Sequence, residues 1–156
     1  MATSTHSGLP KTVTVREPSL EDPAFQAFWL LRIGFTVAPI LFGLDKFFHV
    51  LVNWDTYLAP EVTDLFNARA HTLMHVVGVI EIVAGLVVLV GPRFGAYLVA
   101  AWLAGIILNL LTAGPVHYYD VALRDFGLLL GALALARLAA GVRLRAAAAR
   151  DAYSAH

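Results

Sequence analysis

Four apolar stretches constrain what this chain can fold into more than any other feature of its sequence. They cover about residues 25–52, 70–90, 94–112 and 121–140. A helix of about 20 apolar residues is long enough to cross the roughly 30 Å of hydrocarbon in a bilayer. Because lipid offers the backbone no hydrogen-bond partners, a crossing segment must be helical. The stretches therefore predict an all-α, integral membrane four-helix bundle.

The amino-acid composition agrees with lipid as the solvent. Hydrophobic residues make up 59% of the 156 residues and charged residues only 14%, whereas soluble domains are nearer one half and one quarter. The formal net charge of zero argues against nucleic acid as a partner. The absence of cysteine excludes disulfides, cysteine-ligated iron–sulfur clusters, covalently attached c-type haem and a thiol nucleophile.

The regions outside the four stretches predict the domain boundaries and the orientation. We expect residues 1–23 to be a disordered cytoplasmic tail without a cleavable signal peptide. We expect residues 24–142 to form the transmembrane domain and residues 143–156 to be a basic cytoplasmic tail. Most basic residues lie on the side of the termini, and the opposite loops carry only Arg69 and Arg124. The positive-inside rule therefore puts both termini in the cytoplasm. In the connection between the first two stretches, aromatic residues mixed with acids predict a short interfacial helix.

A layer of polar residues is expected near the outward-facing ends of all four helices. An ionisable group inside a bilayer costs several kcal/mol unless it is paired or functional, so each such residue is a candidate for a site. Their gathering at one depth predicts an outward-facing pocket. The layer comprises Asp45, Lys46, His49, His71, His75, Asn109, His117, Asp120, Arg124 and Asp125, with Glu81 deeper in the bundle.

Histidines and carboxylates in this layer have the spacing of metal ligands. His71 and His75 are four residues apart, so both imidazoles project from one helix face and can share one ion. Asp45 and His49 have the same spacing, and the carboxylate could orient the imidazole. Without a thiolate, a metal ion would be iron, copper or zinc bound through nitrogen and oxygen. Alternatively, histidines on facing helices could clamp a haem b. The candidate metal ligands are His49, His71, His75, His117 and Asp45.

A quinone headgroup is a further candidate ligand for the pocket. Glu81 lies in an otherwise apolar run, and together with Lys46 it could handle protons beside a redox or quinone site. Asp125 is similar but shallower. The residues predicted to bind a cofactor are His49, His117, Asn109 and Tyr118.

Purely structural roles compete with each of these functions. Histidines close to water are ordinary at a membrane interface, and His117 could simply cap the last helix. Lys46 could neutralise Asp45 or Glu81, or extend its charge toward the interface. Tyr118 fits an aromatic belt.

Short sequence motifs in three of the stretches match a known pattern. They are RIG at 32–34, LFGLDK at 41–46, GVIEIVAGLVVLVG at 78–91 and RDFGL at 124–128. In these motifs the chain resembles the DoxX-like membrane family, over the four-helix core and without either tail.

The resemblance implies a multi-pass protein of the bacterial inner membrane. It also implies kinship with the small membrane subunit of thiosulfate:quinone oxidoreductase, which passes electrons to quinone. Lys46, Glu81 and Asp125 fall on the recurring polar positions of the family, which makes them the catalytic candidates. The histidines are not part of the general pattern, so they suggest a specialised branch that binds a metal or a haem.

Two functions are therefore open. The first is a redox-associated subunit whose outward-facing pocket holds a metal ion, a haem or a quinone. The second is a non-catalytic scaffold or accessory subunit, which would act in a larger membrane complex or as a homo-oligomer. A transporter is least favoured, because residues 86–90 and 128–135 offer no polar side chains across the cytoplasmic half.

Overall fold

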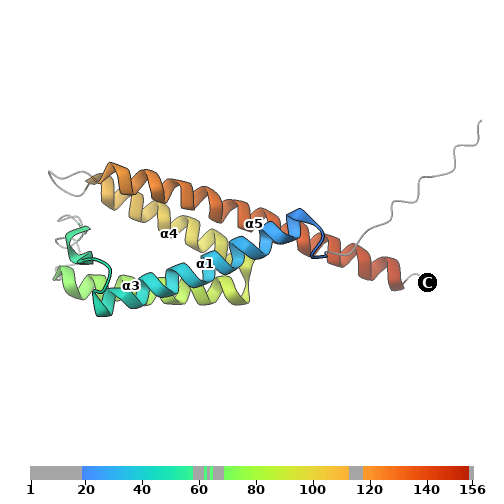
Figure 1. Cartoon of the computed structure of the whole chain (residues 1–156), viewed down its shortest axis with the longest axis horizontal. Helices are drawn as coiled ribbons and strands as arrows, with labels where there is room; N and C mark the ends of the chain where they lie inside the picture. Colours follow the sequence, from blue (N-terminus) through green and yellow to red (C-terminus); the bar gives the residue numbers. More distant parts are fainter. Residues whose placement is uncertain (1–18, 58–61, 63, 65–68, 113–117, 155–156) are drawn as a thin grey trace, which may run out of the picture.

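The computed structural model describes residues 19–57, 62, 64, 69–112 and 118–154, and the described chain contains helices and no strand (Figure 1). All four α-helices are long and apolar enough to cross a membrane, which confirms the predicted all-α architecture with four candidate spans. The predicted disordered tail up to residue 18 and the candidate ligand His117 lie outside the described residues. The helices are α1 (Pro23–Phe48), the 3-10 helix η1 (Trp54–Tyr57), α3 (Ala70–Val90), α4 (Pro92–Thr112) and α5 (Tyr119–Ser154).

Short-range hydrogen bonds fix both ends of α1. Asp22 caps the start of α1, because its carboxylate accepts a hydrogen bond from the backbone N–H of Ala24. Pro23 suits the first helical position, because proline has no backbone N–H that would need a partner there. At the other end His49 adopts a left-handed backbone conformation with φ 52°, and its N–H donates to the carbonyl of Asp45 at 2.7 Å. The helix therefore ends at Phe48, although the apolar run continues beyond it.

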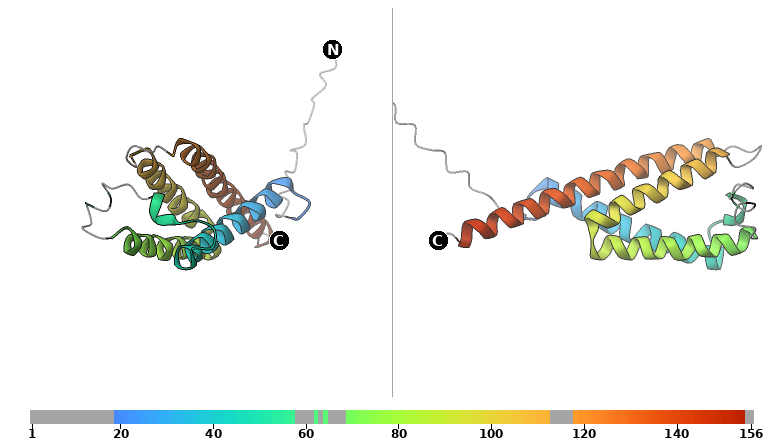
Figure 2. Two further views of the ribbon diagram at one scale, coloured as in Figure 1. Left: turned by 60° about the vertical axis from the view of Figure 1, so that its left-hand side comes forward. Right: turned by 180° about the vertical axis from the view of Figure 1, so that it is seen from behind.

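The four α-helices form two antiparallel pairs. α1 packs mainly against α3, and α4 packs mainly against α5. The two pairs meet near the start of α1 and diverge toward the end that carries η1, which lies between them (Figures 1 and 2). The buried apolar core lies where the pairs meet and consists of Phe28, Ala84, Val88, Ala96, Val99, Ala100, Leu103, Ala132, Leu135, Ala136 and Ala139.

Glycines allow α1 and α3 to approach until their backbones touch. A Cβ added at Gly43 would lie 2.5 Å from the carbonyl oxygen of Gly78, and one added at Gly78 would lie 2.7 Å from that of Gly43. Farther along the same contact, a Cβ at Gly85 would lie 2.7 Å from the carbonyl oxygen of Thr36. Because a real Cβ does not tolerate such distances, this helix pair requires glycine at all three positions.

The last helix is longer than the fourth apolar stretch predicts. The stretch ends near residue 140, but α5 continues through most of the predicted basic tail to Ser154. The alanine run at 146–149 explains the continuation, since alanine has the highest helix propensity. Arg145 of this extension forms an ion pair with Asp22, so the extension of α5 lies beside the start of α1.

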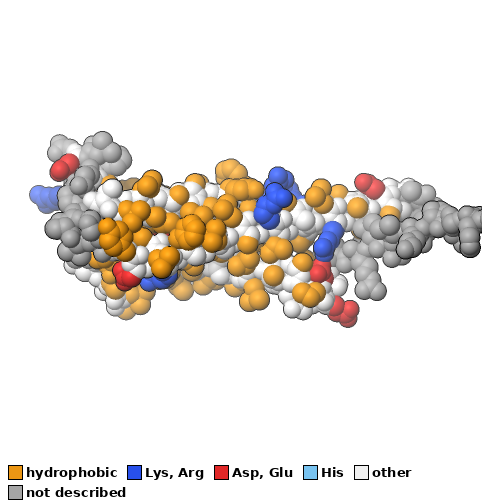
Figure 3. Space-filling model, turned by 90° about the horizontal axis from the view of Figure 1, so that it is seen from above, with side chains coloured by type: hydrophobic (Ala, Val, Ile, Leu, Met, Phe, Trp, Pro, Cys, Tyr) orange, Lys and Arg blue, Asp and Glu red, His pale blue; other side chains and the backbone are white. Residues whose placement is uncertain are grey.

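Large apolar side chains cover the outside of the bundle. Leu30, Leu108 and Leu123 are 74%, 66% and 72% exposed. Figure 3 shows hydrophobic side chains along the length of the helices on one face. An apolar surface of this extent is compatible with contact with a lipid bilayer and unsuited to water.

Candidate functional site

An ion pair between α1 and α3 forms the polar centre of the bundle. Lys46 Nζ lies 2.6 Å from Glu81 Oε2, and the two side chains are only 4% and 11% exposed. Lys46 comes three residues after Gly43 in α1, and Glu81 comes three residues after Gly78 in α3, the two glycines at which the helices touch. Side chains of a helix tilt toward its N-terminus. Because the two helices are antiparallel, Lys46 and Glu81 tilt toward each other.

Asp125 of α5 is the third member of this polar centre. It is buried, it interacts electrostatically with both Lys46 and Glu81, and its Oδ1 lies 3.7 Å from Nε of Arg124. A charge removed from water must be compensated by an opposite charge, which Lys46 and Arg124 supply to Asp125, whereas Glu81 is a like charge. The structure thus brings together, from three helices, the three residues that the sequence selects for proton handling. We call Lys46, Glu81 and Asp125 the buried charge cluster.

Asp45 organises the turn that leaves α1. Its Oδ1 accepts hydrogen bonds from the N–H groups of Val50 at 2.9 Å and Leu51 at 3.1 Å, and its Oδ2 accepts one from Nε1 of Trp54 at 2.6 Å. The sequence predicts that this carboxylate orients His49. In the described structure it instead binds groups of the following loop, and His49 is bonded to Asp45 through the backbone.

Trp54 of η1 covers the buried charge cluster. Lys46 Nζ lies 4.0 Å from the centroid of the Trp54 ring, which is a cation–π contact. The ring also meets Phe42 of α1 edge-on at 6.1 Å. Trp54 therefore contacts both Asp45, through its indole N–H, and Lys46, through its ring face.

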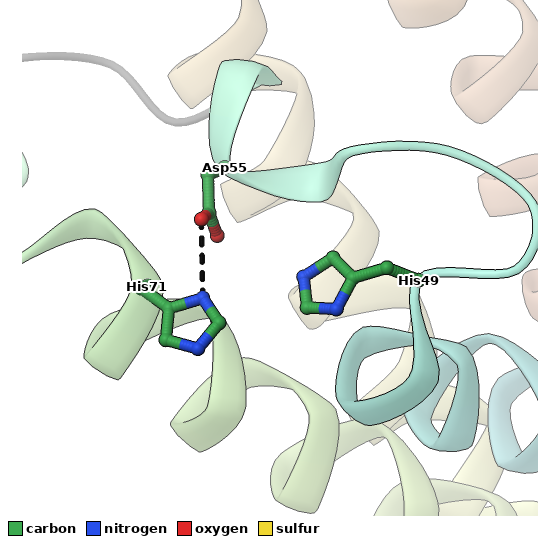
Figure 4. A group of neighbouring side chains, drawn as sticks. All are labelled: His49, Asp55 and His71. Atoms are coloured by element: carbon green, nitrogen blue, oxygen red, sulfur yellow. Dashed lines mark hydrogen bonds and ion pairs between the residues drawn. The ribbon is translucent and has the colours of Figure 1, made fainter.

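His49, Asp55 and His71 converge at the end of the bundle. Each offers one ligand atom, and the three atoms all lie within 4.8 Å of one another. Figure 4 shows the three side chains pointing toward one another from the end of α1, from η1 and from the first turn of α3. His71 Nδ1 lies 3.2 Å from Asp55 Oδ2, and the rings of His49 and His71 stack at 5.5 Å. We call His49, Asp55 and His71 the histidine–aspartate triad.

The triad has the donor atoms that a transition-metal ion requires. Two imidazoles and a carboxylate suit zinc, copper or iron. Ligands of one tetrahedral ion lie about 3.4 Å apart for metal–nitrogen bonds of about 2.1 Å, so modest side-chain rotations would bring the triad to that spacing. Asp55 Oδ1 is buried and has no hydrogen-bond partner within the described part of the chain. A cation bound there would satisfy this oxygen.

His75 lies next to the triad but is held differently. Its ring centroid is 4.3 Å from that of His71, as the spacing along α3 predicts. The ring also stacks flat on Phe47 of α1, with centroids 4.9 Å apart and planes 2° apart. Among the described residues, the ligand atoms that lie within 4.8 Å of one another do not include one of His75. His75 is therefore a neighbour of the triad, and Phe47 fixes the plane of its ring.

The two remaining predicted cofactor ligands contact η1. Asn109 Nδ2 donates to the carbonyl oxygen of Tyr57 at 2.8 Å, and the rings of Tyr118 and Tyr57 lie 4.8 Å apart. Asn109 of α4 and Tyr118, directly before α5, therefore contact η1 in the space between the two helix pairs. The predicted role of His117 stays a prediction, because that residue lies outside the described part of the chain.

Sequence reasoning missed Asp55 and Trp54 as site residues. Both lie among aromatic and acidic residues that indicate an interfacial segment, and neither stands at helical spacing from a histidine. A usable signal is present nonetheless. Asp55 is an acid in a short connection that follows one candidate ligand, His49, and precedes another, His71.

Comparison of the chain with protein-family models, curated proteins and solved structures found no match.

Proposed function

We propose that this chain is a DoxX-like protein of the bacterial inner membrane that serves as a redox-associated subunit. In this proposal both termini are cytoplasmic, η1 lies at the outer interface, and His49, Asp55 and His71 bind a transition-metal ion. The observation that carries the proposal is the convergence of two imidazoles and one carboxylate, with ligand atoms all within 4.8 Å of one another.

The composition of the triad favours iron among the candidate metals. Two histidines and one carboxylate on one side of an ion, with the remaining positions open, form the ligand set of non-haem ferrous sites. Zinc and copper bind the same donors and are the competitors. A haem is less well supported, because the stacked rings of His49 and His71 meet at 5.5 Å and leave no room for a macrocycle between them.

The buried charge cluster supplies the proton chemistry of the proposal. Lys46, Glu81 and Asp125 offer one amine and two carboxylates behind η1, and ionisable groups inside a membrane commonly serve as proton relays. A quinone headgroup is the candidate redox partner at this end of the bundle, where Asn109 and Tyr118 contact η1. An iron ion held by His49, Asp55 and His71 would supply one-electron chemistry with quinone as the partner. The amine and the two carboxylates of the buried charge cluster would hold and exchange the accompanying protons.

Metal titration of the purified protein in lipid nanodiscs tests the proposal. Fe²⁺ is titrated anaerobically by calorimetry, and Co²⁺ is followed by its visible ligand-field bands. We expect one ion per chain, and at least a tenfold loss of affinity in His49→Ala, Asp55→Asn and His71→Ala. Asp120→Asn is the matched control, because Asp120 is an exposed acid at the start of α5. Equal affinity in all four variants would refute the site.

The rival function is an accessory subunit without a cofactor. It is favoured by the small mass outside the helices and by the His71–Asp55 pair, which can dock η1 onto α3 without any ion. The same titration separates the two functions. A protein that binds no metal but is recovered as an oligomer or with partner subunits is an accessory subunit.

A further inference from the structure

The segment from His49 to Tyr57 connects α1 to the 3-10 turn and lies over the buried charge cluster; we call residues 49–57 the lid segment. Its first part is held by Asp45, whose carboxylate binds the N–H groups of Val50 and Leu51. Its last part is held by Asn109 through the carbonyl oxygen of Tyr57. The segment is thus attached to both helix pairs.

Two neighbouring residues of the lid segment belong to two different sites. Trp54 covers the ammonium group of Lys46 at 4.0 Å and donates its indole N–H to Asp45. The next residue, Asp55, is the carboxylate of the histidine–aspartate triad. Because η1 is a single short turn, a force that fixes Asp55 also fixes Trp54.

The protein contacts of the Asp55 side chain hold the lid segment only weakly. Its carboxylate is 27% exposed and contacts His71, which is 57% exposed, at 3.2 Å. An exposed pair of this kind contributes little in water. The second oxygen, Oδ1, has no hydrogen-bond partner in the described structure. A bound ion would replace this single contact with bonds to the end of α1 and to the start of α3.

We propose that metal binding to His49, Asp55 and His71 locks the lid segment closed and thereby shields the Lys46–Glu81 pair from water. The inference rests on the proposed metal site and adds its regulation. A metal that requires Asp55 beside both histidines binds the closed lid better than an open one, and so shifts the population toward the closed state. The proton-exchanging cluster would then open to water only when the metal leaves or loosens.

The chain offers a direct probe, because Lys46 is one of only two lysines and the other is Lys11. Protein in nanodiscs is treated with a small, water-soluble amine reagent, with and without saturating Fe²⁺ or Zn²⁺. Mass spectrometry then gives the labelling rate of each lysine. We expect the metal to slow the labelling of Lys46 at least tenfold. The labelling rate of Lys11 in the same molecule is the internal control, because a direct effect of the metal on the reagent would change both rates.

Variants of Trp54 separate the lid from the metal site. In Trp54→Ala the three ligands are intact, so one ion per chain should still bind, with a smaller loss of affinity than in the ligand variants, while the metal-dependent protection of Lys46 is lost. Trp54→Phe keeps a ring over the ammonium group and should keep most of the protection. Trp54→Phe also keeps the test valid if the alanine variant misfolds. The folding of both variants is checked by size-exclusion chromatography and circular dichroism.

The outcomes distinguish the two proposals. If metal binds with normal affinity but Lys46 is labelled at the same rate with and without it, the lid is refuted and the metal site stands. If calorimetry detects no metal, both are overturned. If the metal protects Lys46 equally in the parent and in Trp54→Ala, the protection does not come from the lid, and the inference fails.

Discussion

The Lys46–Glu81 pair is a buried contact in which each charge depends on the other. A buried pair is a modest source of net stability, because the favourable attraction is offset by lost hydration. Removing one partner is different, since the remaining charge is left without compensation in a medium that solvates it poorly. Replacing one member of the pair should therefore destabilise the protein strongly, whereas replacing both should change its stability little.

Lys46→Met should lower the unfolding free energy by about 3–5 kcal/mol, the usual cost of breaking a buried ion pair from one side. The double variant Lys46→Met/Glu81→Leu should recover most of that loss, because it removes both members of the pair while Asp125 keeps Arg124 as its partner. Unfolding of the purified protein by sodium dodecyl sulfate in mixed micelles measures both. Arg143→Met, on the exposed extension of α5, is the control. A double variant no more stable than the single one would show that these two charges do not compensate each other.

Asp45 should be required for the lid segment to close. Asp45→Ala leaves the indole N–H of Trp54 and two loop N–H groups without their acceptor. We expect a red shift of Trp54 emission, measured in a Trp29→Phe/Trp102→Phe background, and faster labelling of Lys46. Asp64→Ala, which removes an exposed acid of the same connection, should change neither. An unchanged emission spectrum in Asp45→Ala would show that other contacts hold the segment.

Single residues also show where sequence reasoning ends. The spacing of Asp45 and His49 correctly places them on one turn, but spacing within a helix says nothing about loop groups that fold back onto it. The carboxylate is therefore bonded to Val50, Leu51 and Trp54 rather than to the imidazole. Asp55 was missed for the same reason, because its partners are set by the path of a loop.

At the scale of helices, the glycine contact should control the α1–α3 pair. Gly43→Ala would put a Cβ 2.5 Å from the backbone of Gly78, so the helices must separate. We expect a loss of roughly 1–3 kcal/mol, as for other overpacked sites. Gly105→Ala is the matched control in α4, because nothing lies within 4 Å of an added Cβ there. It should be neutral or slightly stabilising, since alanine favours helix.

The test of this contact uses the same detergent titration. Labelling of Lys46 in Gly43→Ala gives a second readout, because separated helices expose the ammonium group. If Gly43→Ala and Gly105→Ala had equal stability, α1 and α3 would not need the close backbone approach.

The helices themselves were largely predictable from the sequence. Hydropathy and length select four spans because a backbone in lipid has no alternative to the helix, and Gly91-Pro92 marks the turn between α3 and α4. Helix ends were less predictable. α1 stops early because His49 turns left-handed, and α5 runs on because alanine and arginine favour helix even where the chain is no longer apolar.

The whole molecule carries a prediction about orientation. The chain has no cysteine, so single cysteines can be placed without a background. In intact bacterial spheroplasts, a membrane-impermeant maleimide should label Asn53→Cys, next to η1. It should label Arg143→Cys, on the extension of α5, only after permeabilisation. The reverse pattern would put the histidine–aspartate triad in the cytoplasm and overturn the proposed topology.

The length of α5 has a mechanical consequence. The helix has 36 residues and no proline, and it runs unbroken from Asp125 in the charge cluster to the extension that carries Arg145. At 1.5 Å per residue, a tilt of about 5° around Asp125 would displace the C-terminal end by about 4 Å. A continuous helix of this length would carry a small tilt at the charge cluster to the C-terminal end as a larger displacement.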